Sequence, residues 1–417
     1  MYFPRTRQFW AVALAHSAND IFMSMSVVLL AFLSLSVVPM NNTEIGAAIS
    51  IQAFTGAISQ PFFGALADRR GGRFVGAFGL TTTASMFFLT ILVAVTTHNY
   101  LLMLIPFILQ GLGSGAVHPV GMLNANESAN GRVASNMAYF FLMGQFGLAM
   151  GPTLVGLLLD AANTDALYHV TSTLRLPGLL VVPGSTGIVP MLPLIAAPVV
   201  AMMLLSIPIR RAQARPKPAP KSQDAPSISV WQLIAPFAAL TVMVVLRGLA
   251  TPGSVNFIPV LFQQKGWSPS EYGAITSVFW VASGISGVVF GNLADRFDRR
   301  WVMMSTMVLA APAFFLLPIT DGIVAFGLAI MAGGFVGGAH SIIVVLAQDL
   351  IPAGKGFASG SILGFIFATG ALGSLIIGSL SDSIGLGTTF QIVAFASAAS
   401  GIMALLIPRG SQSTEVA

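Results

Sequence analysis

Residues 43–73 of the chain read TEIGAAISIQAFTGAISQPFFGALADRRGGR, and residues 270–300 read SEYGAITSVFWVASGISGVVFGNLADRFDRR. The two stretches align at an offset of 227 residues, and further along the chain the repeat continues at an offset of 222. Matching residues keep their chemical type: Gly64 and Gly291, Asp68 and Asp295, Arg73 and Arg300, His118 and His340, Asp160 and Asp382. The sequence therefore predicts two related halves.

Composition predicts that the solvent of this protein is a lipid bilayer. Of its 417 residues, 55% are hydrophobic and only 8% are charged, whereas about 25% are charged in soluble proteins. The chain has no cysteine, which excludes disulfides and thiolate metal sites. The apolar run that follows Met1 to Gln8 is too long for a cleaved signal peptide, so it is interpreted as the first membrane helix.

Twelve segments are apolar over the roughly 20 residues that a membrane span needs. Lipid offers no hydrogen bonds to the backbone, so the segments must be helices. We expect an all-α membrane protein with two pseudo-symmetric six-helix halves, 1–209 and 231–417, joined by a cytoplasmic linker over 210–230. The predicted spans are 9–38, 44–66, 74–96, 100–124, 133–161, 187–208, 231–263, 270–293, 301–320, 322–348, 356–381 and 388–408.

The positive residues predict the orientation. Of the 19 lysines and arginines, sixteen fall on the side of the termini and the linker, Arg175 and Lys265 fall on the other side, and Arg247 lies within a span. Because positive loops stay in the cytoplasm, both termini are expected there, in the plasma (inner) membrane. The net charge of +5 is thus a topology signal, and we expect no nucleic-acid partner, no cofactor, no enzymatic activity and a monomeric chain.

The stretch GALADRRGGR at Gly64 to Arg73 resembles a loop signature of the major facilitator superfamily, and GNLADRFDRR is a weaker second copy. The resemblance implies a transporter with this twelve-span fold. It also implies a latch that closes the cytoplasmic side, made of Asp68, Arg69, Arg73, Asp295, Arg296 and Arg300. The alternative is that the arginines only enforce topology.

A second stretch, GLAMGPTLVG from Gly147 to Gly156, resembles the glycine–proline motif of proton-coupled antiporters in this superfamily. Its characteristic residues are Gly147, Gly151, Pro152 and Gly156. Small residues also serve plain helix packing in membranes, and that alternative stays open.

Two charged residues lie near the middle of predicted spans. Asp20 aligns with Arg247 at the offset of 227, so related halves place opposite charges at equivalent positions. Membrane charges usually face a cavity or a partner, because a charge at mid-bilayer costs ~2.5–3.5 kcal/mol on insertion scales. We predict that Asp20 and Arg247 face each other across a central cavity and that protonation breaks the pair. A static structural ion pair is the alternative.

Other polar residues extend this candidate site. His16 lies one helical turn before Asp20 and suits a proton relay. The His-x-x-x-Asp spacing also suits a divalent metal, but two ligands make no site, so no metal site is predicted. His118 and His340 match across the halves in glycine-rich settings, and Pro252, Gly253 and Pro259 should unwind or bend the seventh span. Further candidates are Asn19, Asn256 and Gln145.

One branch of the superfamily fits best. His16 with Asn19–Asp20, His118–Pro119, and Arg247 with Phe257–Ile258–Pro259 resemble the fosmidomycin-resistance-type exporters, although Val120 stands where that branch usually has Glu. The resemblance implies proton-coupled efflux of a small organic molecule, with an anionic or phosphonate-like compound as the candidate. The alternatives are symport or facilitated uptake of an anionic metabolite, a divalent-metal transporter, and a membrane sensor that transports nothing.

Overall fold

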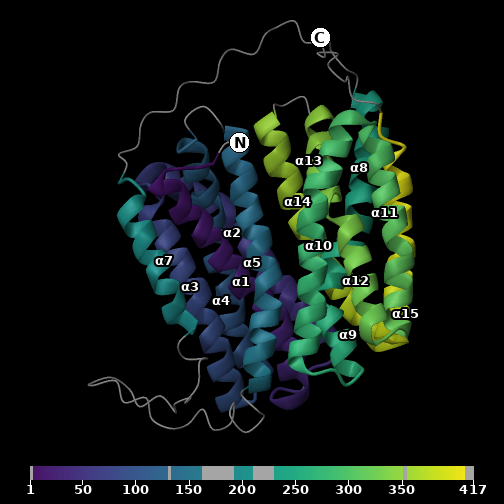
Figure 1. The fold of residues 1–417 in the computed structure, drawn as a ribbon, viewed down its shortest axis with the longest axis horizontal. Coiled ribbons are helices and arrows are strands. Elements are labelled where there is room, and N and C mark those ends of the chain that lie inside the picture. The colour runs from purple at the N-terminus through teal and green to yellow at the C-terminus, as the bar shows by residue number, and fades with distance from the viewer. Residues whose placement is uncertain (1–2, 130–132, 162–191, 210–229, 351–354, 409–417) are drawn as a thin grey trace, which may run out of the picture.

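The computed structural model describes residues 3–129, 133–161, 192–209, 230–350 and 355–408, and these residues fold into helices without a strand (Figure 1). Side chains at a few helical positions, His340 among them, are outside the description. The first half contains α1 (Arg7–Ser36), α2 (Asn42–Arg70), α3 (Gly72–Thr97), α4 (Tyr100–Glu127), α5 (Val133–Ala161) and α7 (Leu192–Ser206). The second contains α8 (Val230–Gly248), η2 (Leu249–Gly253), α9 (Ile258–Gln264), α10 (Pro269–Arg296), α11 (Arg299–Leu316), η3 (Leu317–Ile319), α12 (Gly322–Val336), α13 (Ala339–Leu350), α14 (Lys355–Ile384) and α15 (Leu386–Ala404).

The helices follow the predicted spans. Within the described ranges, nine helices are long and apolar enough to cross a membrane, and α7 and α12 are shorter apolar helices. The predicted second span is α2, a 29-residue helix. The predicted seventh span is broken into α8, η2 and α9, and the predicted tenth into α12 and α13. Residues 210–229 of the predicted linker lie outside the described ranges.

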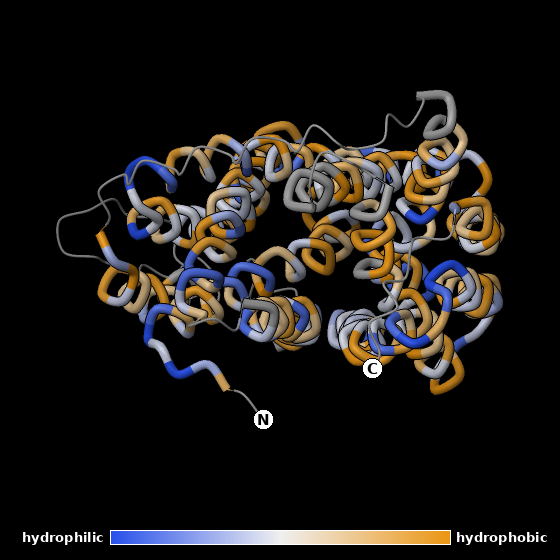
Figure 2. The backbone as a smooth tube through the Cα atoms, turned by 90° about the horizontal axis from the view of Figure 1, so that it is seen from above, coloured by the Kyte–Doolittle hydropathy of each residue, from blue (hydrophilic) through white to orange (hydrophobic). Residues whose placement is uncertain are grey.

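The outer surface of the helices is apolar, as lipid requires. Large apolar side chains point outward on both halves, and Leu205 and Ile323 are 82% and 84% exposed. Figure 2 shows the apolar residues distributed around the whole helical assembly. An exterior of this kind would aggregate in water, whereas in a bilayer it contacts acyl chains.

The two halves stand side by side as separate helical bundles (Figure 1) and meet along two helix pairs, α2 with α14 and α5 with α10. Glycines permit these close crossings. A Cβ atom on Gly46 of α2 would lie 2.5 Å from the carbonyl oxygen of Ser374 in α14. A Cβ atom on Gly273 of α10 would lie 2.3 Å from the carbonyl oxygen of Pro152 in α5. Both contacts are too short for any side chain, so backbone packs directly on backbone.

Two aspartates close one side of the molecule by capping helices of the opposite half. We call the side where α1 begins the proximal side and the side where α1 ends the distal side. At the distal side Asp382 of α14 accepts from the backbone N–H groups of Asn42 (2.9 Å) and Thr43 (2.8 Å) at the start of α2. Asp160 of α5 accepts from the backbone N–H of Ser270 (3.3 Å) at the start of α10.

These two caps are related by the internal repeat, since Asp160 aligns with Asp382 and Thr43 with Ser270. Each carboxylate satisfies free N–H groups at a helix N-terminus and interacts favourably with the helix dipole. Several hydrogen bonds between the halves lie toward this distal side. The distal side is therefore closed.

Two arginines of the loop signatures bind within their own halves, and the latch between the halves stays a prediction. Arg73 donates to the carbonyl oxygen of Ile207 (2.6 Å), just after α7. Arg300 donates to the carbonyl oxygen of Ile407 (3.0 Å), just after α15, and forms an ion pair with Asp298 (2.7 Å). Each arginine thus ties the third span of its half to the end of the sixth. The other predicted latch residues, Asp68, Arg69, Asp295 and Arg296, are exposed at the proximal edge.

The distal caps generate a first prediction. Removing both carboxylates as Asp160→Asn and Asp382→Asn weakens the distal closure, because each lost helix cap costs about 1 kcal/mol, or about fivefold in population. The chain has no native cysteine, so spin labels at Thr96→Cys and Thr388→Cys report the distal separation of the halves. We expect the double variant to enrich the long-distance population.

Asp321→Asn is the matched control, because Asp321 caps α12 and accepts from Trp267 within its own half. An unchanged distance distribution in the double variant would contradict the proposed closure.

Candidate functional site

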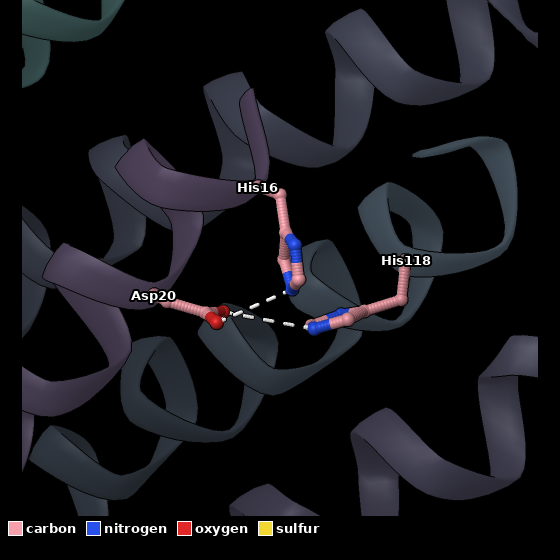
Figure 3. Close-up of side chains that lie close together, drawn as sticks. All are labelled: His16, Asp20 and His118. Atoms are coloured by element: carbon pink, nitrogen blue, oxygen red, sulfur yellow. Dashed lines mark ion pairs between the residues drawn. The ribbon is translucent and has the colours of Figure 1, made fainter. Parts of the chain in front are cut away.

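The three side chains of His16, Asp20 and His118 converge inside the first half (Figure 3). Asp20 and His16 lie one turn apart on α1, and His118 reaches them from α4. His16 Nε2 lies 3.3 Å from Asp20 Oδ2, and His118 Nε2 lies 3.6 Å from Asp20 Oδ1. The side chains of His16 and Asp20 are 6% and 11% exposed, whereas that of His118 is 23% exposed. The cluster is thus nearly enclosed, and His118 is its most accessible member.

The second nitrogen of each imidazole is engaged by a backbone carbonyl. His16 Nδ1 lies 2.9 Å from the carbonyl oxygen of Phe140, and the His16 ring stacks on the Phe140 ring. His118 Nδ1 lies 2.9 Å from the carbonyl oxygen of Ser114. A carbonyl oxygen only accepts hydrogen bonds, so the hydrogen of a neutral imidazole is assigned to Nδ1 in both rings. Both Nε2 atoms then present lone pairs to the Asp20 carboxylate.

A buried amide fixes the carboxylate. The side-chain amide of Asn19 donates to Asp20 Oδ1 (3.0 Å) and to Ser114 Oγ (3.0 Å), and its oxygen accepts from Thr83 Oγ1 (3.1 Å). Asn19 is fully buried, so these bonds hold its amide in one orientation. Three helices, α1, α3 and α4, therefore position the acceptors of the cluster.

Glycines of α5 leave the room that the cluster occupies. A Cβ atom on Gly144 would lie 2.4 Å from His16 Cε1 and 2.9 Å from Asp20 Oδ2. One turn further on, a Cβ atom on Gly147 would lie 2.3 Å from the carbonyl oxygen of Ser17. Any side chain at these positions would separate α5 from α1 or displace the cluster.

The glycine–proline motif of α5 packs against both halves. Gly147 and Gly151 contact α1, where a Cβ atom on Gly151 would lie 2.4 Å from the carbonyl oxygen of Ile21. Gly156 and Pro152 contact α10 of the other half, where a Cβ atom on Gly156 would lie 2.3 Å from the carbonyl oxygen of Pro269. The motif thus places α5 between the cluster and the interface of the halves.

Arg247 does not form the predicted ion pair with Asp20. In the described part of the chain Asp20 finds its partners within its own half, and α1 packs on α3, α4, α5 and α7, whereas α8 packs on α14 and α15. Arg247 is 5% exposed, and its Nε has no hydrogen-bond partner. Thr251 Oγ1, four residues on, is likewise buried and unpartnered. Two histidines and Asn19 of its own half, rather than Arg247, therefore lie beside the Asp20 carboxylate.

The break after Arg247 confirms the predicted unwinding of the seventh span. The α-helix ends at Gly248, and a π-helical turn over Leu249–Gly253 follows. Pro252 lacks an N–H group, and its ring packs beside Gly370 of α14. Asn256, another candidate, donates to Ser374 Oγ (3.0 Å) of the same half. His340 lies in α13, and its side chain is outside the described residues.

Comparison with known proteins settles the family. The sequence profile of the Major Facilitator Superfamily matches residues 12–265 and 237–416. The chain belongs to the Major Facilitator Superfamily. This confirms the resemblance drawn from the loop signatures and identifies a multi-pass membrane protein of a transporter family. The members of this family are transporters, which are not enzymes.

Relatives extend over almost the whole length of this major facilitator chain. It is 24% identical over 403 residues to the uncharacterized MFS-type transporter YfnC of Bacillus subtilis, covering 95% of this chain and 91% of that protein. It is 23% identical over 393 residues to the fosmidomycin resistance protein of Escherichia coli, covering 92% and 89%. The crystal structure of a mutant of the nucleoside transporter NupG superposes with a TM-score of 0.72 at 14% identity, covering 96% and 99%.

Sequence reasoning missed two features of this major facilitator site. His118 was a candidate, but its place beside His16 and Asp20 depends on how α4 packs on α1, about a hundred residues apart in sequence. Gly144 stands just before the glycine–proline motif and was not singled out. Its position three residues before Gly147 puts both on one face of α5, a signal that could have found it.

The room beside the cluster generates a second prediction. Gly144→Ala inserts a methyl group against His16 and Asp20, and overpacking of this kind typically costs about 1–3 kcal/mol. We expect a lower melting temperature in detergent. Gly327→Ala is the matched control, because a Cβ atom there meets nothing within 4 Å. Equal melting temperatures of Gly144→Ala and the wild type would disprove this packing.

Proposed function

We propose that this chain is a proton-coupled secondary transporter that exports a small organic anion by alternating access. The observation that supports it is the convergence of two imidazole Nε2 atoms on the Asp20 carboxylate. Both Nδ1 hydrogens are directed at carbonyl oxygens, so the two Nε2 atoms, like the carboxylate oxygens, only accept hydrogen bonds. Asn19 supplies the amide donor. Acceptor atoms this close repel one another unless a cation lies between them, and a proton is the simplest such cation.

A proton enters the cluster through His118 in this mechanism. Its side chain is the most exposed of the three, and imidazole is a common proton carrier in proteins. The proton then bridges an imidazole nitrogen and the Asp20 carboxylate, which removes the repulsion. Binding and release of this proton change the net charge of the cluster. Because α1 and α4 both contribute to the cluster, the attraction between these two helices changes with it.

Arg247 is the proposed recognition element for the substrate. Burying a guanidinium N–H without a hydrogen-bond acceptor costs free energy. An anionic group of the substrate would supply that acceptor. The free hydroxyl of Thr251 lies four residues further along the chain, within the π-helical turn, and suits a second oxygen of a carboxylate, phosphate or phosphonate. A π-helical turn is a common feature of functional sites.

The closed distal side supports alternation about the two interfaces of the halves. Rocking of the halves breaks the Asp160 and Asp382 caps and opens the distal side, while α5 and α10 slide on glycine contacts. With the predicted orientation of the termini, the closed distal side is the side that faces away from the cytoplasm. Export then requires loading of the anion from the cytoplasm and return of the proton.

The coupling proposal predicts that Asp20→Asn uncouples proton movement from transport. The probe is fosmidomycin, after the relative that confers resistance to it. We expect a fosmidomycin gradient across proteoliposomes to drive proton flux in the opposite direction, read by an internal pH dye, and Asp20→Asn to abolish this flux. Asparagine keeps the side-chain size but holds no carboxylate proton.

Asp321→Asn, which changes a distal surface carboxylate outside the cluster, is the control and should keep the flux. Proton flux in the same direction as fosmidomycin would indicate uptake by symport instead of export. Undiminished flux in Asp20→Asn would disprove the role of the cluster.

The recognition proposal predicts that Arg247→Gln weakens anion binding by about 10- to 100-fold, since hydrogen bonds to charged groups contribute about 1.5–3 kcal/mol. Binding of fosmidomycin and simple phosphonates is followed by calorimetry on purified protein. Arg300→Gln is the control, because Arg300 is already paired with Asp298 at the proximal edge. Equal affinities in Arg247→Gln and the wild type would remove Arg247 from the site.

A further inference from the structure

We propose that His16, Asp20 and His118 also form a binding site for one divalent transition-metal ion of the zinc class. The sequence predicted no metal site, because the His-x-x-x-Asp pair on α1 supplies only two ligands. The structure adds the third from α4 (Figure 3). This inference goes beyond the proposed function, since metal binding is measured on purified protein whether or not protons drive transport.

The distances suit such an ion. The ligand atoms of the three side chains all lie within 4.8 Å of one another. Zinc lies about 2.0–2.2 Å from imidazole nitrogen and carboxylate oxygen, and a tetrahedral arrangement at that radius separates its ligands by roughly 3.4 Å. His16 Nε2 lies 3.3 Å from Asp20 Oδ2, which is near this separation, whereas the 3.6 Å contact of His118 Nε2 is to the other oxygen, Oδ1. A small rotation of the more exposed His118 completes the approach.

The groups behind the ligands match those of metal sites. Metal-bound histidines almost always donate their other N–H to a carbonyl, a carboxylate or water, which fixes the tautomer and the ring orientation. Here both Nδ1 atoms face backbone carbonyl oxygens at 2.9 Å. Asn19 holds the carboxylate in the same way, through its own bonds to Ser114 and Thr83. Both Nε2 lone pairs therefore face the Asp20 carboxylate.

The chemistry of the ligands selects the ion. Two imidazoles and one carboxylate suit zinc, cobalt and nickel, whereas magnesium and calcium prefer oxygen ligands. A doubly charged cation also neutralises the carboxylate and cancels the repulsion among the three acceptors. With three protein ligands, the fourth tetrahedral position is open, as in zinc sites that bind water or substrate.

The test is equilibrium dialysis of purified, chelator-free protein in detergent against zinc chloride. We expect one tightly bound zinc ion per wild-type chain, and at least 100-fold weaker binding in His118→Gln and in His16→Gln, because loss of even an outer-shell partner costs 10–100-fold. His98→Asn is the control. That histidine lies at the distal end of α3, where its Nδ1 contacts the carbonyl oxygen of Val37, and its loss should leave zinc binding unchanged.

X-ray absorption of zinc-loaded wild-type protein supplies a second readout that needs no variant, and we expect scattering from two imidazole rings. Several outcomes would overturn the proposal: no stoichiometric zinc, unchanged affinity in both folded cluster variants, loss of binding in His98→Asn, or a zinc spectrum with fewer than two imidazoles. Because this experiment involves no proton flux and no organic anion, its failure leaves the proposed transport function standing, and failure of the flux assay leaves the zinc site standing.

Discussion

The site depends on one constraint: the backbone carbonyl oxygens of Phe140 and Ser114 hold the Nδ1 hydrogens of two histidines, so both Nε2 lone pairs face the carboxylate of Asp20. In the interior of a membrane protein such a set of acceptors is costly without a cation. Neighbouring residues support this arrangement of the three side chains. Asn19 fixes the carboxylate, the glycines of α5 leave room for it, and α5 links it to the interface between the halves.

The internal repeat organises the rest of the molecule. It places Asp160 and Asp382 at equivalent ends, where each caps a helix of the opposite half, and it places Arg73 and Arg300 where each ties together helices of its own half. One set of contacts thus joins the halves at the distal side, and the other stiffens each half at the proximal side. This arrangement suits the proposed movement of the halves as two rigid bodies about a breakable distal contact.

The fold was predictable from the sequence. A bilayer requires helical spans of a set length, and the repeat and the loop signature can be recognised in the sequence itself. The break after Arg247 was predictable from Pro252 and Gly253. The partner of Asp20 was not. Alignment of the halves placed Arg247 at the equivalent position, but symmetry of sequence does not say which side chains meet. His118 reaches Asp20 because α4 packs on α1, and that crossing is a tertiary feature with no local signal.

The measurement that tests the central claim most directly is nitrogen NMR of protein labelled with ¹⁵N-histidine, with assignments from His16→Gln and His118→Gln. The chain has only five histidines, and the nitrogen shifts report which ring atom carries the hydrogen. The account predicts that neutral His16 and His118 carry it on Nδ1 and leave Nε2 bare. Hydrogen on Nε2 in both rings would contradict it, because each imidazole would then donate to Asp20 and the cluster would need no added cation.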